Sequence, residues 1–223
     1  MRARHATPDH PTPPFDDVAG WIAVPDVLET GEASTLAAEC LTLLADLGHD
    51  TRPGDKAVAG TLHLVDLLER VPRTGAIVEH ELILRAIEHL VGPNARQADI
   101  SFRCPQPGYG GQRLHADWIP LGAVGLAQIA TAIVALCDFT ADNGATRVVP
   151  GSHLRPDQQR LSGNLERHPD EVALTGKAGT AFVFSGHLLH SGTVNRSSAP
   201  RPALQIIWRR PGASVIEALG SVQ

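Results

Sequence analysis

From Arg96 onward the chain is a succession of short apolar or alternating runs, separated by clusters of Gly, Pro, Asn, Asp and Ser. Alternation over a few residues, bounded by turn-forming residues, predicts strands joined by short connections. The runs occupy residues 98–103, 112–118, 128–138, 145–149, 171–175, 180–185, 188–194 and 203–210. This pattern is typical of a β-sandwich or barrel.

Two helices are predicted before this strand-rich region. Apolar residues recur at helical spacing over residues 30–47, which begin with a threonine suited to capping and are followed by Gly48. A second helix is predicted over residues 74–91, ended by Gly92 and Pro93. Residues 15–28 predict a short strand running into a turn. We therefore expect a mainly β fold with N-terminal helices, built as an antiparallel double-stranded β-helix of the jelly-roll or cupin-like kind.

A chain of 223 residues is long enough for one domain with a substantial core. We expect this single domain to span residues 15–210. Residues 1–14 are rich in proline and polar groups and predict a disordered lead. Residues 211–223 form a tail without an assigned function, and residues 52–60 predict an exposed loop.

Composition and charge argue against several classes of function. No apolar run approaches the roughly 20 residues of a membrane helix, and the N-terminus lacks the apolar stretch of a secretory signal, so we expect a cytoplasmic protein. The net charge of −5, with both signs interspersed, argues against nucleic acid as a partner. Cys40, Cys104 and Cys137 lack the spacing of a disulfide framework or a thiolate zinc site. The expected partner is a small-molecule substrate, free or tethered to a carrier.

His115 and Asp117 stand two residues apart in the predicted strand 112–118. Alternate residues of a strand point to the same face, so the imidazole and the carboxylate would enter one cavity. His187 and His190, near the end of a later run, are both candidates for a third ligand. Two histidines and one carboxylate form the facial triad of non-haem iron(II) oxygenases, which favours iron over zinc. A hydrogen-bonded pair without a metal is the alternative interpretation of the His-Ala-Asp motif.

Arg201 follows these histidines, just before the last predicted strand. A planar guanidinium can bind a carboxylate through two parallel hydrogen bonds, which a lysine cannot reproduce. Arg201 is therefore a candidate for binding a dicarboxylate co-substrate. The alternative is a surface salt bridge.

The His-Ala-Asp motif, the segment NGATRVVPGSH at 143–153 and the segment from His190 to NRSSAPR at 195–201 occur in this order. Over roughly residues 15–210, this order resembles the phytanoyl-CoA dioxygenase family of Fe(II)- and 2-oxoglutarate-dependent oxygenases. The resemblance implies Fe(II) as the metal, 2-oxoglutarate and O2 as co-substrates, and a metal site made of His115, Asp117 and His190. It also implies that Arg201 binds the distal carboxylate of 2-oxoglutarate.

The resemblance selects His190 over His187, because the ligand histidine of the family precedes the glycine, the asparagine and the arginine as His190 does here. His187 is then expected to face solvent or substrate, and His153 to be a structural residue beside the site. Further positions that match polar co-substrate contacts of the family are Arg103, Gln112 and Thr131.

The implied reaction couples the oxidative decarboxylation of 2-oxoglutarate, which yields succinate and CO2, to oxidation of an unactivated C–H bond. Related halogenases replace the carboxylate ligand with a small residue so that chloride can bind. Because Asp117 is present, we expect hydroxylation, desaturation or ring formation. The alanine- and arginine-rich composition is compatible with a bacterial biosynthetic enzyme that acts on a specialised metabolite.

Two other classes of protein remain open at this point. One is a non-catalytic metal- or ligand-binding barrel, and the other is a zinc or manganese hydrolase or isomerase, which would not need Arg201. The short interval between Asp117 and His190 predicts trimmed loops and an open pocket, which a partner chain could cover, although we expect a monomer or a weak homo-oligomer. The aromatic residues near the motifs are expected in the core rather than in the pocket, namely Phe102, Tyr109, Trp118 and Trp208.

Overall fold

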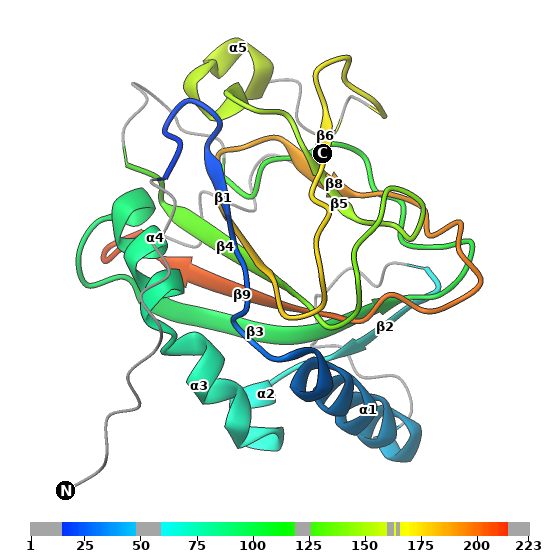
Figure 1. Cartoon of the computed structure of the whole chain (residues 1–223). Helices are drawn as coiled ribbons and strands as arrows, with labels where there is room; N and C mark the ends of the chain where they lie inside the picture. Colours follow the sequence, from blue (N-terminus) through cyan, green and yellow to red (C-terminus); the bar gives the residue numbers. More distant parts are fainter. Residues whose placement is uncertain (1–14, 48–58, 119–125, 160–162, 164–165, 214–223) are drawn as a thin grey trace, which may run out of the picture.

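Two antiparallel sheets and a layer of helices make up the computed structural model, which describes residues 15–47, 59–118, 126–159, 163 and 166–213 (Figure 1). The larger sheet has six strands in the order β1 (Trp21–Val24), β7 (Ala181–Ser185), β4 (Ile129–Ala135), β9 (Ala203–Arg209), β3 (Arg96–Pro105) and β2 (Thr61–Leu64). The smaller sheet has three strands in the order β6 (Val172–Ala173), β5 (Thr146–Val148) and β8 (His190–Gly192). The predicted jelly-roll fold is confirmed, as an open barrel in which, among the described residues, no strand is shared between the two sheets.

The helices cover the outer face of the larger sheet (Figure 1). They are α1 (Thr30–Leu47), α2 (Leu67–Arg70), α3 (Gly75–Val78) and α4 (Glu81–Val91). Two short helices, η2 (Ser152–Leu154) and α5 (Pro156–Gln159), follow β5. In the described part of the chain, no helix combines the length and the apolar character needed to cross a membrane.

Strand alternation decides which residues of the larger sheet face the helices and which face the inside of the barrel. In β9, Leu204, Ile206 and Trp208 join the core cluster beneath the helices, whereas Gln205 and Ile207 line a cavity on the other face. The same alternation in β3 and β4 puts further side chains on the cavity side. The main apolar core therefore lies between sheet and helices, and a second apolar cluster, which includes Phe139, Phe182 and Phe184, lies between the two sheets beside the cavity.

The predicted helix over 30–47 is confirmed, but the predicted helix over 74–91 is wrong as a single element. The structure divides this region into η1 (Pro72–Thr74), α3 and α4, with extended backbone at His80 (φ −63°, ψ 121°). Ile77 and Ile83 are both buried in the same core cluster. Residues six apart lie on different faces of a continuous α-helix, so the interruption lets both side chains reach the core.

The predicted strand over 112–118 does not form a regular strand. Within the described residues, this segment makes an isolated bridge between His115 and His190, and backbone bonds from Trp118 N to Gly186 O (3.1 Å) and from Gln112 N to Gly192 O (3.0 Å). Between the bridge and the Gln112 bond, two residues of the segment are opposite a single residue of β8, Ser191, so the pairing shifts register as in a β-bulge. The other predicted runs correspond to β3 to β9, several of them shortened. The strand β2 was not predicted. Three predicted segments lie outside the described residues, namely the disordered lead, most of the 52–60 loop and the tail beyond residue 213.

Candidate metal and co-substrate site

His115, Asp117 and His190 meet at the inner face of the smaller sheet. One ligand atom from each residue lies within 4.8 Å of the others. The Nε2 atom of His190 is 3.6 Å from Oδ1 of Asp117, and the two imidazole centroids are 4.5 Å apart. Figure 1 shows the segments that carry them, the stretch after β3 and the strand β8, lying across from the larger sheet. The structure therefore brings together the three residues selected from the sequence.

Hydrogen bonds orient each of these side chains toward a common point. Nδ1 of His115 faces the carbonyl of Arg113 at 3.0 Å, and Nδ1 of His190 faces the carbonyl of Leu188 at 2.9 Å. A ring nitrogen facing a carbonyl carries the proton, which leaves the Nε2 lone pair for a metal. The hydroxyl of Thr131 donates to Oδ2 of Asp117 at 3.0 Å.

The electrostatics of the site also suit a metal ion. Burial lowers the pKa of His190, while Asp117 partly opposes that effect. Neutral imidazoles and a carboxylate are the ligand forms that divalent metals bind. Two nitrogen donors and one oxygen donor fit the facial triad of non-haem iron(II) sites.

A cavity of about 380 Å³ opens beside the triad. His115, Asp117 and His190 form one wall, and the inner face of the larger sheet forms the opposite wall. The other residues that line it are Thr61, Arg103, Pro105, Gly110, Gln112, Ile133, Thr146, Phe184, Gly192, Arg201, Ala203, Gln205 and Ile207. Its size is within the range of pockets that bind small molecules.

Arg201 is the buried cation of this cavity, with 6% of its surface exposed. Its guanidinium carbon lies 4.7 Å from the centroid of the Phe139 ring, and its Nε has no hydrogen-bond partner among the described residues. Burial lowers the pKa of Arg201 to about 10, against a smaller opposite effect of the nearby Cys137 and Cys104 thiols. Arg201 stays charged at neutral pH, and a buried cation without a counter-charge is costly. A carboxylate bound in the cavity would satisfy it.

The three further co-substrate candidates are placed differently. Arg103 and Gln112 line the cavity, as expected for residues that contact a bound ligand. Thr131 does not line it and instead bonds to Asp117. Alternation in β4 brings Thr131 beneath Asp117, where its hydroxyl supports the carboxylate.

His187 and His153 lie outside the triad. His187 is 2% exposed and accepts a hydrogen bond from Gln128 N at 3.3 Å, so the expectation that it faces solvent or substrate is wrong. Burial, with a smaller effect of His153, lowers the pKa of His187 to about 4. His153 contacts the carbonyl of Asp17 at 3.0 Å and packs against Gly20, where an added Cβ would lie 2.4 Å from its ring.

The aromatic residues divide between core and surface. Phe102, Trp118 and Trp208 are buried away from the cavity, whereas Tyr109 is 50% exposed rather than in the core. Sequence reasoning missed Phe184, which lines the cavity with its ring centroid 4.8 Å from that of His190. Its position in a buried apolar strand did not distinguish it from core residues.

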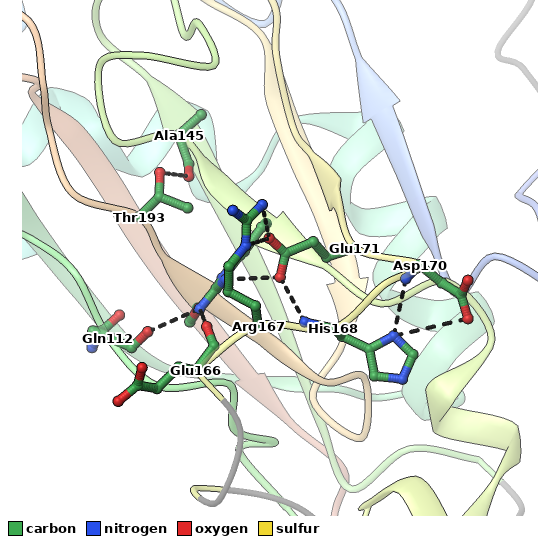
Figure 2. Close-up of polar contacts among 10 residues, drawn as sticks. Gln112, Ala145, Glu166, Arg167, His168, Asp170, Glu171 and Thr193 are labelled. Atoms are coloured by element: carbon green, nitrogen blue, oxygen red, sulfur yellow. Dashed lines mark hydrogen bonds and ion pairs between the residues drawn. The ribbon is translucent and has the colours of Figure 1, made fainter.

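Sequence reasoning also missed Arg147, whose side chain is buried behind β8. Its guanidinium donates to the Glu171 carboxylate and to the carbonyls of Gln112 and Glu166, three partners that Figure 2 labels. The available signal was a charged residue inside the apolar run 145–149.

Comparison with known proteins agrees with this geometry. The family model of phytanoyl-CoA dioxygenase matches residues 17–203. The multifunctional dioxygenase prhA of Penicillium brasilianum is 33% identical over 120 residues, which cover 47% of this chain and 38% of prhA. The uncharacterized protein Rv1501 of Mycobacterium tuberculosis is 30% identical over 201 residues, covering 83% of this chain and 69% of Rv1501.

Solved structures share the fold. The non-heme alpha-ketoglutarate-dependent carbocyclase SnoK from nogalamycin biosynthesis has a TM-score of 0.67 at 21% identity, with 88% of this chain and 84% of SnoK covered. HygX from Streptomyces hygroscopicus, with nickel, 2-oxoglutarate and hygromycin B bound, has a TM-score of 0.69 at 17% identity, with 88% and 85% covered. Because the family model matches most of the length of this chain, the chain belongs to the phytanoyl-CoA dioxygenase family.

Proposed function

We propose that this protein is an Fe(II)- and 2-oxoglutarate-dependent dioxygenase that hydroxylates, or otherwise oxidises, an unactivated C–H bond of a small molecule. The observation that carries the proposal is that the triad and the buried Arg201 line the same cavity. A zinc or manganese hydrolase on this fold would have no use for a buried arginine whose Nε has no acceptor in the described part of the chain. A metal-binding barrel without catalysis would not need a carboxylate-binding group either.

Each residue has a defined task in this proposal. His115, Asp117 and His190 would hold iron through Nε2, a carboxylate oxygen and Nε2, with Thr131 fixing the carboxylate. Arg201 would bind the distal carboxylate of 2-oxoglutarate with a forked pair of hydrogen bonds. When bound, iron(II) and 2-oxoglutarate supply the oxidising chemistry with O2 and release succinate and CO2. Phe184, Ile133 and Ile207 keep the cavity wall apolar and exclude water.

The ligand set and the structural neighbours support the class of oxidation that we propose. The carboxylate of Asp117 would occupy the coordination position that a halide needs, which favours hydroxylation, desaturation or ring formation over halogenation. SnoK is a carbocyclase, and HygX binds hygromycin B. A specialised metabolite is accordingly the substrate class that we propose.

The test is an anaerobic titration of the Fe(II)-loaded protein with 2-oxoglutarate. Bidentate chelation of iron by the keto acid should produce a weak visible charge-transfer band. Arg201→Ala should require more 2-oxoglutarate to produce it, whereas Arg85→Ala, which removes an exposed arginine of α4, should not. Bound iron without any band in the wild-type protein would contradict the proposal.

A further inference from the structure

A buried ion pair lies behind the metal site and is not part of the cavity. Nη1 of Arg147 is 2.7 Å from Oε2 of Glu171, and the two side chains are only 8% and 12% exposed. Nε of Arg147 donates to Oγ of Ser191 at 2.8 Å. Nη2 donates to the carbonyls of Gln112, at 3.3 Å, and of Glu166. Figure 2 labels Gln112, Glu166 and Glu171, the partners that come from the segment before His115 and from residues 166–171.

The strand register places Arg147 on the face of the smaller sheet that points away from the metal. β5 pairs with β8 so that Arg147 is opposite Ser191, while Thr146 is opposite Gly192. Thr146, His190 and Gly192 line the cavity. Because successive residues of a strand point to opposite faces, Arg147 and Ser191 lie on the outer face. Arg147 thus contacts the residue next to a metal ligand without reaching the metal.

The strand β8 pairs regularly with β5, but the segment that leads to His115 and Asp117 is not part of either sheet. The stretch before His115 shifts register against β8 and forms no ladder. Two side-chain contacts compensate for this loss, from Arg147 to the Gln112 carbonyl and from Gly192 N to Oε1 of Gln112 at 3.1 Å. The guanidinium therefore connects the segment leading to His115 and Asp117 with the strand that begins at His190.

The anion that faces Arg147 is itself held in place. Glu171 accepts hydrogen bonds from the backbone N of His168 at 3.0 Å and from Nε of Arg167 at 3.1 Å (Figure 2). Burial alone would raise the pKa of Glu171, but these contacts and Arg147 bring this pKa below its usual value. A buried ion pair is tolerated where its remaining hydrogen-bonding groups are satisfied, and fixed partners give it one geometry. Glu171 is thus a fixed anchor for the guanidinium.

We propose that Arg147 is a positioning residue that sets the relative placement of the two ligand-bearing segments from outside the cavity. Segment 166–171 serves as its anchor. The inference rests on the proposed function, because it assumes that His115, Asp117 and His190 bind a metal. Groups that support metal ligands from behind typically change metal affinity by roughly 10- to 100-fold when they are removed.

The experiment measures the affinity of the metal-free protein for Co(II) and records the hyperfine-shifted, exchangeable proton resonances of the ligand histidines in the Co(II) protein. Arg147→Lys keeps the charge but cannot reach Ser191, Gln112 and Glu171 together. We expect Co(II) binding to weaken roughly 10-fold or more and the histidine resonances to shift. Arg73→Lys alters an ion pair with Glu39 far from the metal and should change neither readout.

Ser191→Ala covers the case in which Arg147→Lys does not fold. It removes only the acceptor of Nε, and we expect a smaller loss of Co(II) affinity with the same kind of spectral shift. If the folded variants bind Co(II) as the wild-type protein does, with unshifted resonances, the positioning role is wrong and the proposed function stands. If the wild-type protein binds no Co(II), both ideas are wrong.

Discussion

His115 and His190 exchange a pair of backbone hydrogen bonds, 2.9 Å from His115 N to His190 O and 2.8 Å in the reverse direction. Two residues far apart in the sequence are thereby direct cross-strand neighbours, with their imidazoles side by side. This single bridge sets the distance between two ligands of the site. The geometry of the metal site therefore depends on the contact between the segment after β3 and the strand β8.

Replacement of His115 or His190 with Ala should abolish iron binding and leave the fold intact, because each side chain faces the cavity rather than the apolar core. The measurement is iron content after anaerobic loading, with circular dichroism as the test of folding. His187→Ala is the control, since His187 is buried outside the triad. Loss of iron in the His187 variant, with retention in the His190 variant, would reverse the choice between these two histidines.

Arg201→Lys should weaken 2-oxoglutarate binding by about 10- to 100-fold, because an ammonium cannot form the forked pair of hydrogen bonds that a guanidinium offers. Iron affinity should not change. Pyruvate is the matched ligand, since it keeps the keto acid but lacks the distal carboxylate. Its affinity should be the same in the variant and the wild-type protein. An equal loss for both ligands would mean that Arg201 does not contact the distal carboxylate.

Thr131→Val should reduce metal affinity by roughly 10-fold, because the hydroxyl that holds Oδ2 of Asp117 is lost while the side-chain shape is kept. Competition with a metal-sensitive dye gives the affinity. Thr74→Val removes another buried hydroxyl, which bonds to Val71 O at 2.8 Å and is remote from the site. An equal effect of both substitutions on metal affinity would show that the Thr131 contact has no specific role.

The buried His187 should make the protein less stable in acid. Its folded pKa of about 4 lies below the unfolded value of about 6.5, so the unfolded chain binds a proton first as the pH falls. The stability that neutral His187 contributes is therefore fully present above pH 6.5 and is lost as the pH falls toward 4. We expect the free energy of unfolding to decrease by about 2 kcal/mol between pH 7.5 and pH 5. Urea unfolding at both pH values should detect a smaller loss in His187→Gln. An identical loss in variant and wild type would contradict the assignment.

Much of the fold and of the site was predictable from sequence because it depends on local patterns. The spacing of apolar residues in 30–47 and the runs after Arg96 reflect the periods of a helix and of strands. The ligand types were also evident, since His115, Asp117 and Arg201 carry groups that few structural roles require together. The choice of His190 over His187 needed the family resemblance, because both histidines lie within the short segment 186–192.

Other features were decided only by tertiary structure. The register shift beside Ser191 and the inward or outward direction of Phe184 and Thr131 depend on which segments pair across the barrel. The break at His80 depends on how the helices pack against the larger sheet. Sequence alone determined which chemical groups were available to the site and the spacing of apolar residues along each helix or strand. Long-range packing decided which groups meet, because a buried polar side chain such as Arg147 is stable only where distant segments supply all of its partners.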